Sequence, residues 1–291
     1  MASGLHILIT GASGFVGRRL SHMALAKGHR VTALVRDAAG LPAGCEALVH
    51  SLGSGAPLRL PPGVDAVAHL AQSRVYRAFP GDADEMYRVN VAGAHELLSA
   101  AAEAGASRFC LASSGTVYEP FAGVLAEDAS LAPSSNLGAT KLAAEIIAKP
   151  YASLFPVSAL RLFAPYGPDQ TARLIPDLIG RVGRGEAVTL PSTGGGMRFC
   201  PTHVDDICEV MLTALRESWI GTFNVAAPEV LTIEEAARAI GAKLEKEPCF
   251  ERKPIAAPSI VPSLAKLGAH YDIERFRSFS EGIAATAANE R

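Results

Sequence analysis

The hydrophobic positions of the chain fall into short, nearly continuous apolar runs, separated by alanine- and leucine-rich stretches with helical periodicity. Such runs predict strands covered on both faces, and the stretches between them predict helices. Strands that alternate with helices are typical of an α/β fold with a doubly wound parallel sheet. The predicted strands cover residues 5–10, 29–35, 46–50, 65–71, 108–113 and 157–163, and the predicted helices cover 15–27, 84–104 and 138–153.

The regular alternation ends near residue 165, where prolines and glycines punctuate shorter segments. We therefore expect a first domain over residues 1–165, completed by about residues 200–228, and a smaller second lobe over 166–199 and 229–291. The C-terminal third is also expected to fold. Its Thr232 and Glu235 have the spacing of a capping box in front of a helix that ends near Gly241.

Composition and charge narrow the class of protein. The 291 residues are 49% hydrophobic and 19% charged, which excludes disordered and fibrous chains. The 27 basic and 29 acidic side chains are interspersed and give a formal net charge of -2. No basic patch for nucleic acid or an anionic membrane surface is evident, so neither partner is expected.

The cysteines and the apolar runs bear on location. Five cysteines without a CxxC pair or a tight cluster indicate free thiols in a reducing compartment, without disulfides or a zinc site. The first apolar run lacks the basic start and the length of a signal peptide, and no later run is long enough to span a membrane. A cytoplasmic enzyme or binding protein is therefore expected.

A glycine-rich turn follows the first predicted strand directly and leads into the first predicted helix. In a dinucleotide-binding fold such glycines permit a tight turn, let the backbone approach a pyrophosphate, and open the helix N-terminus to the phosphates. An ordinary glycine turn is the alternative for the motif in isolation. Its place in a βαβ pattern favours cofactor binding, with the contacting residues Gly11, Ser13, Gly14, Phe15, Val16 and Gly17.

The end of the second predicted strand bears on the choice between NAD and NADP. An acidic side chain there holds the ribose 2′-hydroxyl of NAD, whereas an arginine accommodates the 2′-phosphate of NADP. Val35 stands at the expected acidic position and Arg36 follows it, with Arg18 and Arg19 in the first helix. A guanidinium suits bidentate phosphate contacts, so the pattern favours NADP. NAD is the alternative, with Arg36 solvated and Asp37 turned toward the ribose.

Eight segments, in order along nearly the whole chain, carry a family resemblance. They are TGASGFVG at 10–17, DAVAHLA at 65–71, VNVAGAHELL at 89–98, RFCLASSGTVYE at 108–119, GATKLAAE at 138–145, LRLFAPYGP at 160–168, HVDD at 203–206 and GTFNVA at 221–226. With these segments the chain resembles the extended short-chain dehydrogenase/reductase family, of the NAD-dependent epimerase/dehydratase type, whose members act mostly on nucleotide-linked sugars. The resemblance implies a Rossmann fold with a smaller C-terminal substrate lobe.

The resemblance also implies roles for single residues. Ser114 falls where the family places a hydroxyl that hydrogen-bonds the reacting oxygen of the substrate. Lys141 matches the lysine that holds the nicotinamide ribose and lowers the pKa of a neighbouring phenol. These two are the candidate catalytic residues. The other implied positions of the cofactor site are Leu70, Ala71, Asn90 and Phe163.

The main departure from the family lies four residues before Lys141. The family pairs a tyrosine with this lysine one helical turn apart, so that the ammonium makes the phenol a competent proton donor or acceptor. This chain has Leu137 at that position. Because a leucine cannot exchange a proton, the usual hydride-transfer mechanism lacks its central group. Acid–base catalysis by a positioned side chain typically raises the reaction rate by about 10²- to 10⁴-fold.

Four residues are candidates for replacing the tyrosine. Tyr118 and Glu119 are the nearest ionisable side chains in the sequence, and Ser135 and Asn136, beside position 137, would hold a water molecule. A buried structural tyrosine and a solvated loop glutamate explain Tyr118 and Glu119 equally well.

Features of the second half bear on substrate and metal binding. Ala164 stands where many sugar-nucleotide enzymes of the family carry an asparagine, and Arg198 lies five rather than four residues before His203. Both departures weaken the nucleotide-sugar interpretation. His203 with Asp205 and Asp206 suggests a metal, but carboxylates at a helix start act more simply as partners of the helix dipole, so no metal is expected.

Two functions stay open on the sequence alone. The first is an NAD(P)-dependent oxidoreductase, epimerase or dehydratase, which acts by hydride transfer on a carbinol or keto group of a small molecule such as a nucleotide-linked sugar. A water molecule or a displaced side chain then relays the proton. The second is a catalytically silent dinucleotide-binding protein that serves as a sensor or partner. The family usually dimerises through helices that here span 84–104 and 138–153, so a homodimer is expected.

Overall fold

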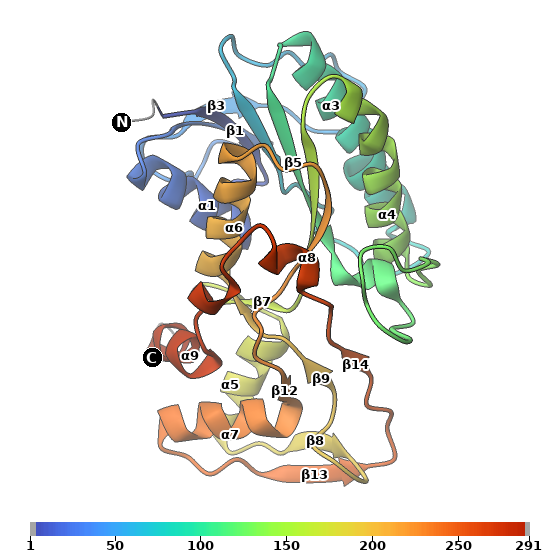
Figure 1. The fold of residues 1–291 in the computed structure, drawn as a ribbon. Coiled ribbons are helices and arrows are strands. Elements are labelled where there is room, and N and C mark those ends of the chain that lie inside the picture. The colour runs from blue at the N-terminus through green and yellow to red at the C-terminus, as the bar shows by residue number, and fades with distance from the viewer. Residues whose placement is uncertain (1–3, 289–291) are drawn as a thin grey trace. The chain divides into compact units, whose positions relative to one another are not determined.

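A computed structural model describes residues 4–288, which form two compact units (Figure 1). Unit 1 comprises the residues up to Pro120 together with Ser130–Leu162 and Cys208–Phe223. Unit 2 comprises Phe121–Ala129, Phe163–Ile207 and the residues from Asn224 onward. Across residues 4–288, no helix combines the length and apolar character that crossing a membrane requires.

The centre of unit 1 is a seven-stranded sheet in the order β11-β6-β5-β4-β1-β2-β3. The neighbours from β6 to β3 all pair in parallel, with Ile9 of β1 opposite Ala33 of β2 and Ala68 of β4. Nearly continuous apolar strands are typical of a parallel sheet that helices cover on both faces. The predicted doubly wound parallel sheet is confirmed. The strands are β1 (His6–Thr10), β2 (Arg30–Val35), β3 (Glu46–Val49), β4 (Ala66–His69), β5 (Arg108–Ser114), β6 (Val157–Leu162) and β11 (Gly221–Val225).

Helices lie on both faces of this sheet. In Figure 1, α3 (Gly93–Glu103) and α4 (Asn136–Ala148) run beside each other on one face, and α1 (Phe15–Ala26) lies on the other. The core under α3 and α4 includes Leu97, Phe109 and Phe155. On the α1 side, Lys27 pairs with Glu209 of α6 (Val204–Arg216) at 3.0 Å.

The two long helices differ in detail from their predicted form. The predicted helix 84–104 consists of α2 (Ala83–Met86), a π-helical segment η1 (Tyr87–Ala92) and α3. The predicted helix 138–153 begins two residues earlier, because the Ser135 hydroxyl caps it by accepting from the Gly138 N–H at 3.1 Å. It ends as a 3₁₀ segment, η3 (Lys149–Ser153), at Pro150, which has no N–H to donate.

Unit 2 has a helical core with short strand pairs around it. Buried residues such as Ile179, Phe199, Ile240 and Phe279 pack together. The predicted capping box at Thr232 is confirmed, and its helix continues to Leu244 rather than ending near Gly241. The helices are α5 (Leu174–Arg184), α7 (Ile233–Leu244), α8 (Ala265–Gly268) and α9 (Phe279–Ala288), and the strands pair as β7 (Pro165–Tyr166) with β10 (Thr202–His203), β8 (Val188–Pro191) with β13 (Phe250–Lys253), and β9 (Arg198–Phe199) with both β12 (Leu231–Thr232) and β14 (Ser259–Ile260).

Candidate functional site

The glycine turn between β1 and α1 is packed so closely that side chains are excluded. Gly11 has a φ of +68°, and the N–H of Gly14 donates to its carbonyl oxygen at 2.8 Å. A β-carbon on Gly17 would lie 2.1 Å from that same oxygen, and one on Gly11 would lie 2.9 Å from the carbonyl carbon of Leu70. Each of these glycines therefore has a steric reason to be glycine.

The N-terminus of α1 fits an anionic group. Its N-cap is Gly14, which provides no side-chain cap, and its first turn holds no acidic residue. The first N–H groups of a helix lack intrahelical partners and carry the positive end of the helix dipole. Ser13, Phe15 and Val16 are each half-buried at this turn. The turn thus has the shape and polarity that the pyrophosphate of a dinucleotide needs.

At the end of β2 a positive charge faces solvent. Val35 is buried, whereas Arg36 and Asp37 are exposed. The Asp37 carboxylate accepts a hydrogen bond from the N–H of Ala39 at 2.9 Å. This bond closes the backbone turn that follows β2. Arg18, in the first turn of α1, is exposed as well.

The segment after β4 is fixed to β1 by Thr10. The Thr10 hydroxyl oxygen accepts the N–H groups of Leu70 and Ala71 at 3.1 and 3.0 Å and lies 2.8 Å from Nδ1 of His69. Burial lowers the pKa of His69 to about 3, with the Lys141 charge acting in the same direction. His69 is therefore neutral, and since Thr10 already accepts twice, its hydroxyl donates to Nδ1.

Asn90 joins the segment after β4 to α4. Its side chain is buried within η1, where Oδ1 accepts the N–H of Ser73 at 3.0 Å and Nδ2 donates to the Thr140 hydroxyl at 3.1 Å. The Thr140 hydroxyl in turn donates to the Asn136 carbonyl at 2.9 Å. The π-helical turn therefore fixes a buried amide between two elements.

Lys141 lies on α4 with its ammonium buried against β5. Its Nζ donates to the Ala112 carbonyl at 2.9 Å, and only 5% of the residue is exposed. Burial lowers the pKa of Lys141 to about 8, although Glu145 one turn later opposes the shift. This cation therefore titrates close to neutrality.

Ser114 and Leu137 occupy neighbouring elements at the carboxyl end of β5. The Ser114 hydroxyl accepts both the N–H and the hydroxyl of Thr116 in the 3₁₀ segment η2 (Gly115–Tyr118). Helix α4 packs tightly on η2. The closeness is evident at Gly138, where a β-carbon would lie only 2.6 Å from the Thr116 carbonyl oxygen. Half-buried Leu137 precedes Gly138 and lies one turn before Lys141.

A buried ionic network beneath Ser114 was missed by the sequence interpretation. Arg161 on β6 donates to both carboxylate oxygens of Glu145, at 3.0 and 2.8 Å, and to the Tyr118 hydroxyl at 2.6 Å. The Ser113 hydroxyl donates to the same carboxylate. The one available signal was that Glu145 lies one turn after Lys141 on the same helix.

The network bears on the candidates for replacing the tyrosine. Tyr118 is buried, and the Arg161 guanidinium also lies 4.8 Å above its ring, so its place is structural. The Glu119 carboxylate accepts the N–H of Ser135 at 3.0 Å and therefore fixes the start of α4. Neither side chain is held ready to move a proton.

The remaining predicted residues lie in unit 2. Phe163 is buried there, with its N–H donating to the Val225 carbonyl at 3.1 Å. Ala164 has a φ of +37°, and Arg198 is exposed on β9. Phe163 therefore belongs to a different unit from the other predicted site residues.

Charged residues at the start of α6 are engaged within unit 2. Asp206 forms a close ion pair with Arg277 at 2.5 Å, and Asp205 lies 3.4 Å from the same guanidinium. His203 packs edge-on against Tyr166 at 5.4 Å between ring centroids. Among residues 4–288, no group of three histidine, cysteine, aspartate or glutamate side chains is arranged to hold a metal.

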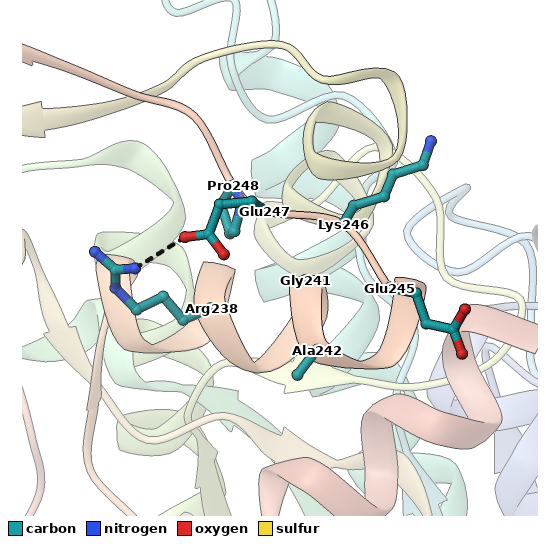
Figure 2. A pocket seen from close by; sticks show the side chains of 7 residues that line it. All are labelled: Arg238, Gly241, Ala242, Glu245, Lys246, Glu247 and Pro248. Carbon is teal, nitrogen blue, oxygen red and sulfur yellow. Dashed lines mark hydrogen bonds and ion pairs between the residues drawn. The ribbon is translucent and has the colours of Figure 1, made fainter.

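A hollow in unit 2 lies beside the end of α7, as Figure 2 shows. Arg238 pairs with Glu247 across it at 3.3 Å, and the Lys246 ammonium donates to the Gly183 carbonyl. Three of its charged side chains thus interact with groups of the same chain, and we assign no site to the hollow.

The parallel sheet and the glycine turn define a Rossmann fold, the fold class of dinucleotide-binding proteins. The profile of the NAD dependent epimerase/dehydratase family matches residues 7–226. The chain belongs to this family, as its sequence motifs predict.

Three similar proteins illustrate the range of the family. The low-salt glycan biosynthesis protein Agl12 of Haloferax volcanii is 33% identical over 59% of this chain and 57% of its own length. A 3-diazoavenalumate denitrifying reductase of a Streptomyces species is 31% identical over 82% of both chains. MoeE5, solved in complex with UDP-glucuronic acid and NAD, superposes with a TM-score of 0.83 at 27% identity over 98% of this chain and 99% of its own. The chain spans less than two thirds of the length of several curated relatives.

Proposed function

We propose that the protein is an NAD(P)-dependent oxidoreductase, epimerase or dehydratase that acts by hydride transfer on a carbinol or keto group. The observation that carries the proposal is the glycine turn. Its three glycines cannot carry a β-carbon without close contacts to the backbone, and the uncapped N-terminus of α1 lies beside them. An ordinary turn needs no such combination of close packing and an open helix end.

We assign cofactor binding to unit 1 and substrate selection to unit 2. In unit 1, Gly11, Ser13, Gly14 and Gly17 would hold the pyrophosphate, and Leu70 and Ala71 would line the path from β4 toward the nicotinamide. Phe15 and Val16, in the first turn of α1, would contact the dinucleotide as well. When bound, the nicotinamide supplies or accepts the hydride, while the protein contributes position and field.

We further propose a preference for NADP over NAD. The support is the exposed guanidinium of Arg36 at the end of β2, with Arg18 exposed in the first turn of α1. Asp37, the competing ribose ligand, is engaged with the N–H of Ala39. Two arginines suit a doubly charged phosphate better than a ribose hydroxyl.

In the proposed reaction Ser114 orients the reacting oxygen and Lys141 binds the ribose. The Ser114 oxygen already accepts from Thr116, which leaves its own proton for a substrate oxygen. Lys141 would exchange its bond to Ala112 for one to the ribose, and Asn90 holds α4 in place for this exchange. A water molecule or a displaced side chain would relay the proton where Leu137 stands.

For the substrate we propose a small molecule, with a nucleotide-linked sugar as the first to test. MoeE5, at 27% identity over nearly the whole chain, was solved with a UDP-sugar acid. Ala164 offers no side-chain amide to a diphosphate, so we expect sugar-diphosphate affinity to be weaker than an asparagine would give.

We also propose a cytoplasmic homodimer. The five cysteines all lie within the described residues, and none of them forms a disulfide there. Ile146 on α4 and Tyr87 on η1 expose apolar side chains from the helices that the family resemblance assigns to the dimer contact.

A fluorescence titration of nucleotide-free protein with NADPH and with NADH tests the proposal. Saturable binding that prefers NADPH and weakens at least several-fold in Arg36→Ala is expected, because a bidentate phosphate contact is lost. Arg59→Ala, another exposed arginine of unit 1, serves as the control. Binding of neither nucleotide would rule out the redox function and leave a scaffold or another chemistry.

A further inference from the structure

The first turn of α4 presents an apolar side chain where proton exchange would be most useful. Leu137 lies one turn before Lys141, and Gly138 presses this turn against the Thr116 carbonyl next to Ser114. Position 137 therefore lies one turn from Lys141, in the helical turn that packs against the segment following Ser114. A leucine there exchanges no proton.

Three ionisable side chains of unit 1 near this turn are committed to other partners. The Tyr118 hydroxyl accepts from Arg161, and the Glu119 carboxylate accepts from the Ser135 N–H. From β4, His69 presents a neutral ring that is hydrogen-bonded to Thr10.

The two charged side chains of α4, Lys141 and Glu145, also have hydrogen-bond partners. The Glu145 carboxylate, one turn further along α4, accepts two hydrogen bonds from Arg161 and one from the Ser113 hydroxyl. The Lys141 ammonium donates to the Ala112 carbonyl. These described side chains of unit 1 are therefore committed to protein partners rather than placed as a general acid for the oxygen of a carbonyl acceptor.

The lack of a positioned acid affects hydride acceptors unequally. A hydride delivered to a carbonyl carbon leaves an alkoxide, which must gain a proton, so the absence of a general acid costs about 10²- to 10⁴-fold. A carbon that is already cationic, or that bears a leaving group able to take the electron pair, needs no proton. Its reduction escapes this penalty completely.

We propose that the site has a further activity, the reduction of carbons whose electron pair departs with a leaving group, represented by the ring carbon of an aryl diazonium ion. This inference rests on the proposed hydride-transfer function. The reduced nicotinamide dinucleotide gives up two electrons and one hydrogen and becomes oxidised. A carbon–hydrogen bond forms, the carbon–nitrogen bond breaks, and its electron pair leaves with dinitrogen. No proton is taken up.

The test compares two acceptors in three proteins. The acceptors are 4-diazoniobenzoate and 4-acetylbenzoate, an aryl diazonium ion and an aryl ketone with the same carboxylate. The proteins are the wild type, Leu137→Tyr and Leu137→Phe, where the last two differ only by a hydroxyl. Cofactor deuterated at the transferred position marks product formed by hydride transfer, and a mixture without protein gives the background reaction.

The expected result is an effect of the hydroxyl on one acceptor alone. Leu137→Tyr should reduce the ketone about 10²- to 10⁴-fold faster than Leu137→Phe, and the two variants should reduce the diazonium ion at rates within a few-fold of each other. The wild type should form deuterated benzoate above background and little deuterated alcohol.

Three results would overturn the inference. One is a wild type that binds the cofactor but forms no deuterated benzoate above background. Another is ketone reduction by the wild type as fast as by Leu137→Tyr, which would mean that Lys141 or another group donates the proton. If neither nucleotide binds at all, the proposed function fails together with this inference.

A measurement without turnover tests the geometry alone. The phenol introduced by Leu137→Tyr would lie one turn from the Lys141 ammonium, so an ultraviolet absorbance titration should show one phenol with a lowered pKa. The signal should revert in the double variant Leu137→Tyr/Lys141→Met. An unshifted titration would show that position 137 does not face the ammonium and would remove the basis of the inference.

Discussion

Glu145 and Arg161 form a two-point ion pair that is almost completely withdrawn from solvent, with 2% and 3% of their side chains exposed. Removal of one partner leaves the other charge buried without compensation. Arg161→Met should therefore lower the free energy of unfolding by about 3–5 kcal/mol, measured by urea denaturation. Arg184→Met, which breaks the exposed pair with Glu186, should cost less than about 1 kcal/mol. Equal costs at both sites would contradict this assignment.

Two buried tyrosines should respond in opposite ways to loss of the hydroxyl. The Tyr166 hydroxyl has no hydrogen-bond partner among the described residues, whereas the Tyr118 hydroxyl accepts from Arg161. Tyr166→Phe should be neutral or stabilising, and Tyr118→Phe should cost about 1–3 kcal/mol because a buried guanidinium N–H loses its acceptor. Thermal unfolding of both variants checks the prediction. A destabilised Tyr166→Phe would reveal a partner for that hydroxyl.

The strands of the central sheet, the glycine turn after β1 and the capping box at Thr232 could be predicted from the sequence. Each of these features is encoded within a few consecutive residues. Glycine spacing alone located Gly11 and Gly17, and Thr232 and Glu235 lie on one helical turn. The Glu145–Arg161 pair could not be predicted, since its partners lie 16 residues apart on different elements. For the same reason, the sequence could not decide whether Tyr118 is structural or catalytic. Several strands of unit 2 have only two residues, too few for a period.

Lys141 should make stability depend on pH. Burial lowers its folded pKa from 10.5 to about 8, so the unfolded chain binds the proton more tightly and the buried charge opposes folding below pH 8. This opposition should fade as the pH rises from about 8 to 10.5, by about 3 kcal/mol in total. Urea unfolding at a series of pH values should show a rise that is absent from Lys141→Met. Parallel curves for the two proteins would show that Lys141 is not desolvated.

Gly17→Ala should destabilise unit 1 and weaken dinucleotide binding. The added carbon would lie 2.1 Å from the Gly11 carbonyl oxygen, so the backbone must move, at a cost of about 1–3 kcal/mol. Gly183→Ala in α5 is the matched control, since its added carbon comes no closer than 3.9 Å to a Leu244 methyl group. The control should be neutral or stabilising by up to about 1 kcal/mol. Thermal unfolding and NADPH titration measure both effects, and a Gly17→Ala variant as stable as the control would contradict the packing.

The homodimer can be tested with a charge on the exposed face of α4. Ile146 is 53% exposed, and Ile146→Asp should produce a monomer in light scattering, because a buried unpaired carboxylate is costly. Ile220→Asp is the control, since Ile220 is 61% exposed and lies outside the helices expected to pair. A wild type that is itself monomeric would end the proposal.

The close packing of the glycine turn is the first link in a chain of contacts between distant parts of unit 1. Gly17 lies against Gly11, and Gly11 lies against the Leu70 carbonyl at the start of the segment after β4. That segment is joined through Asn90 to Thr140 on α4. These contacts leave the glycine turn, the segment after β4 and the start of α4 little room to move independently of one another.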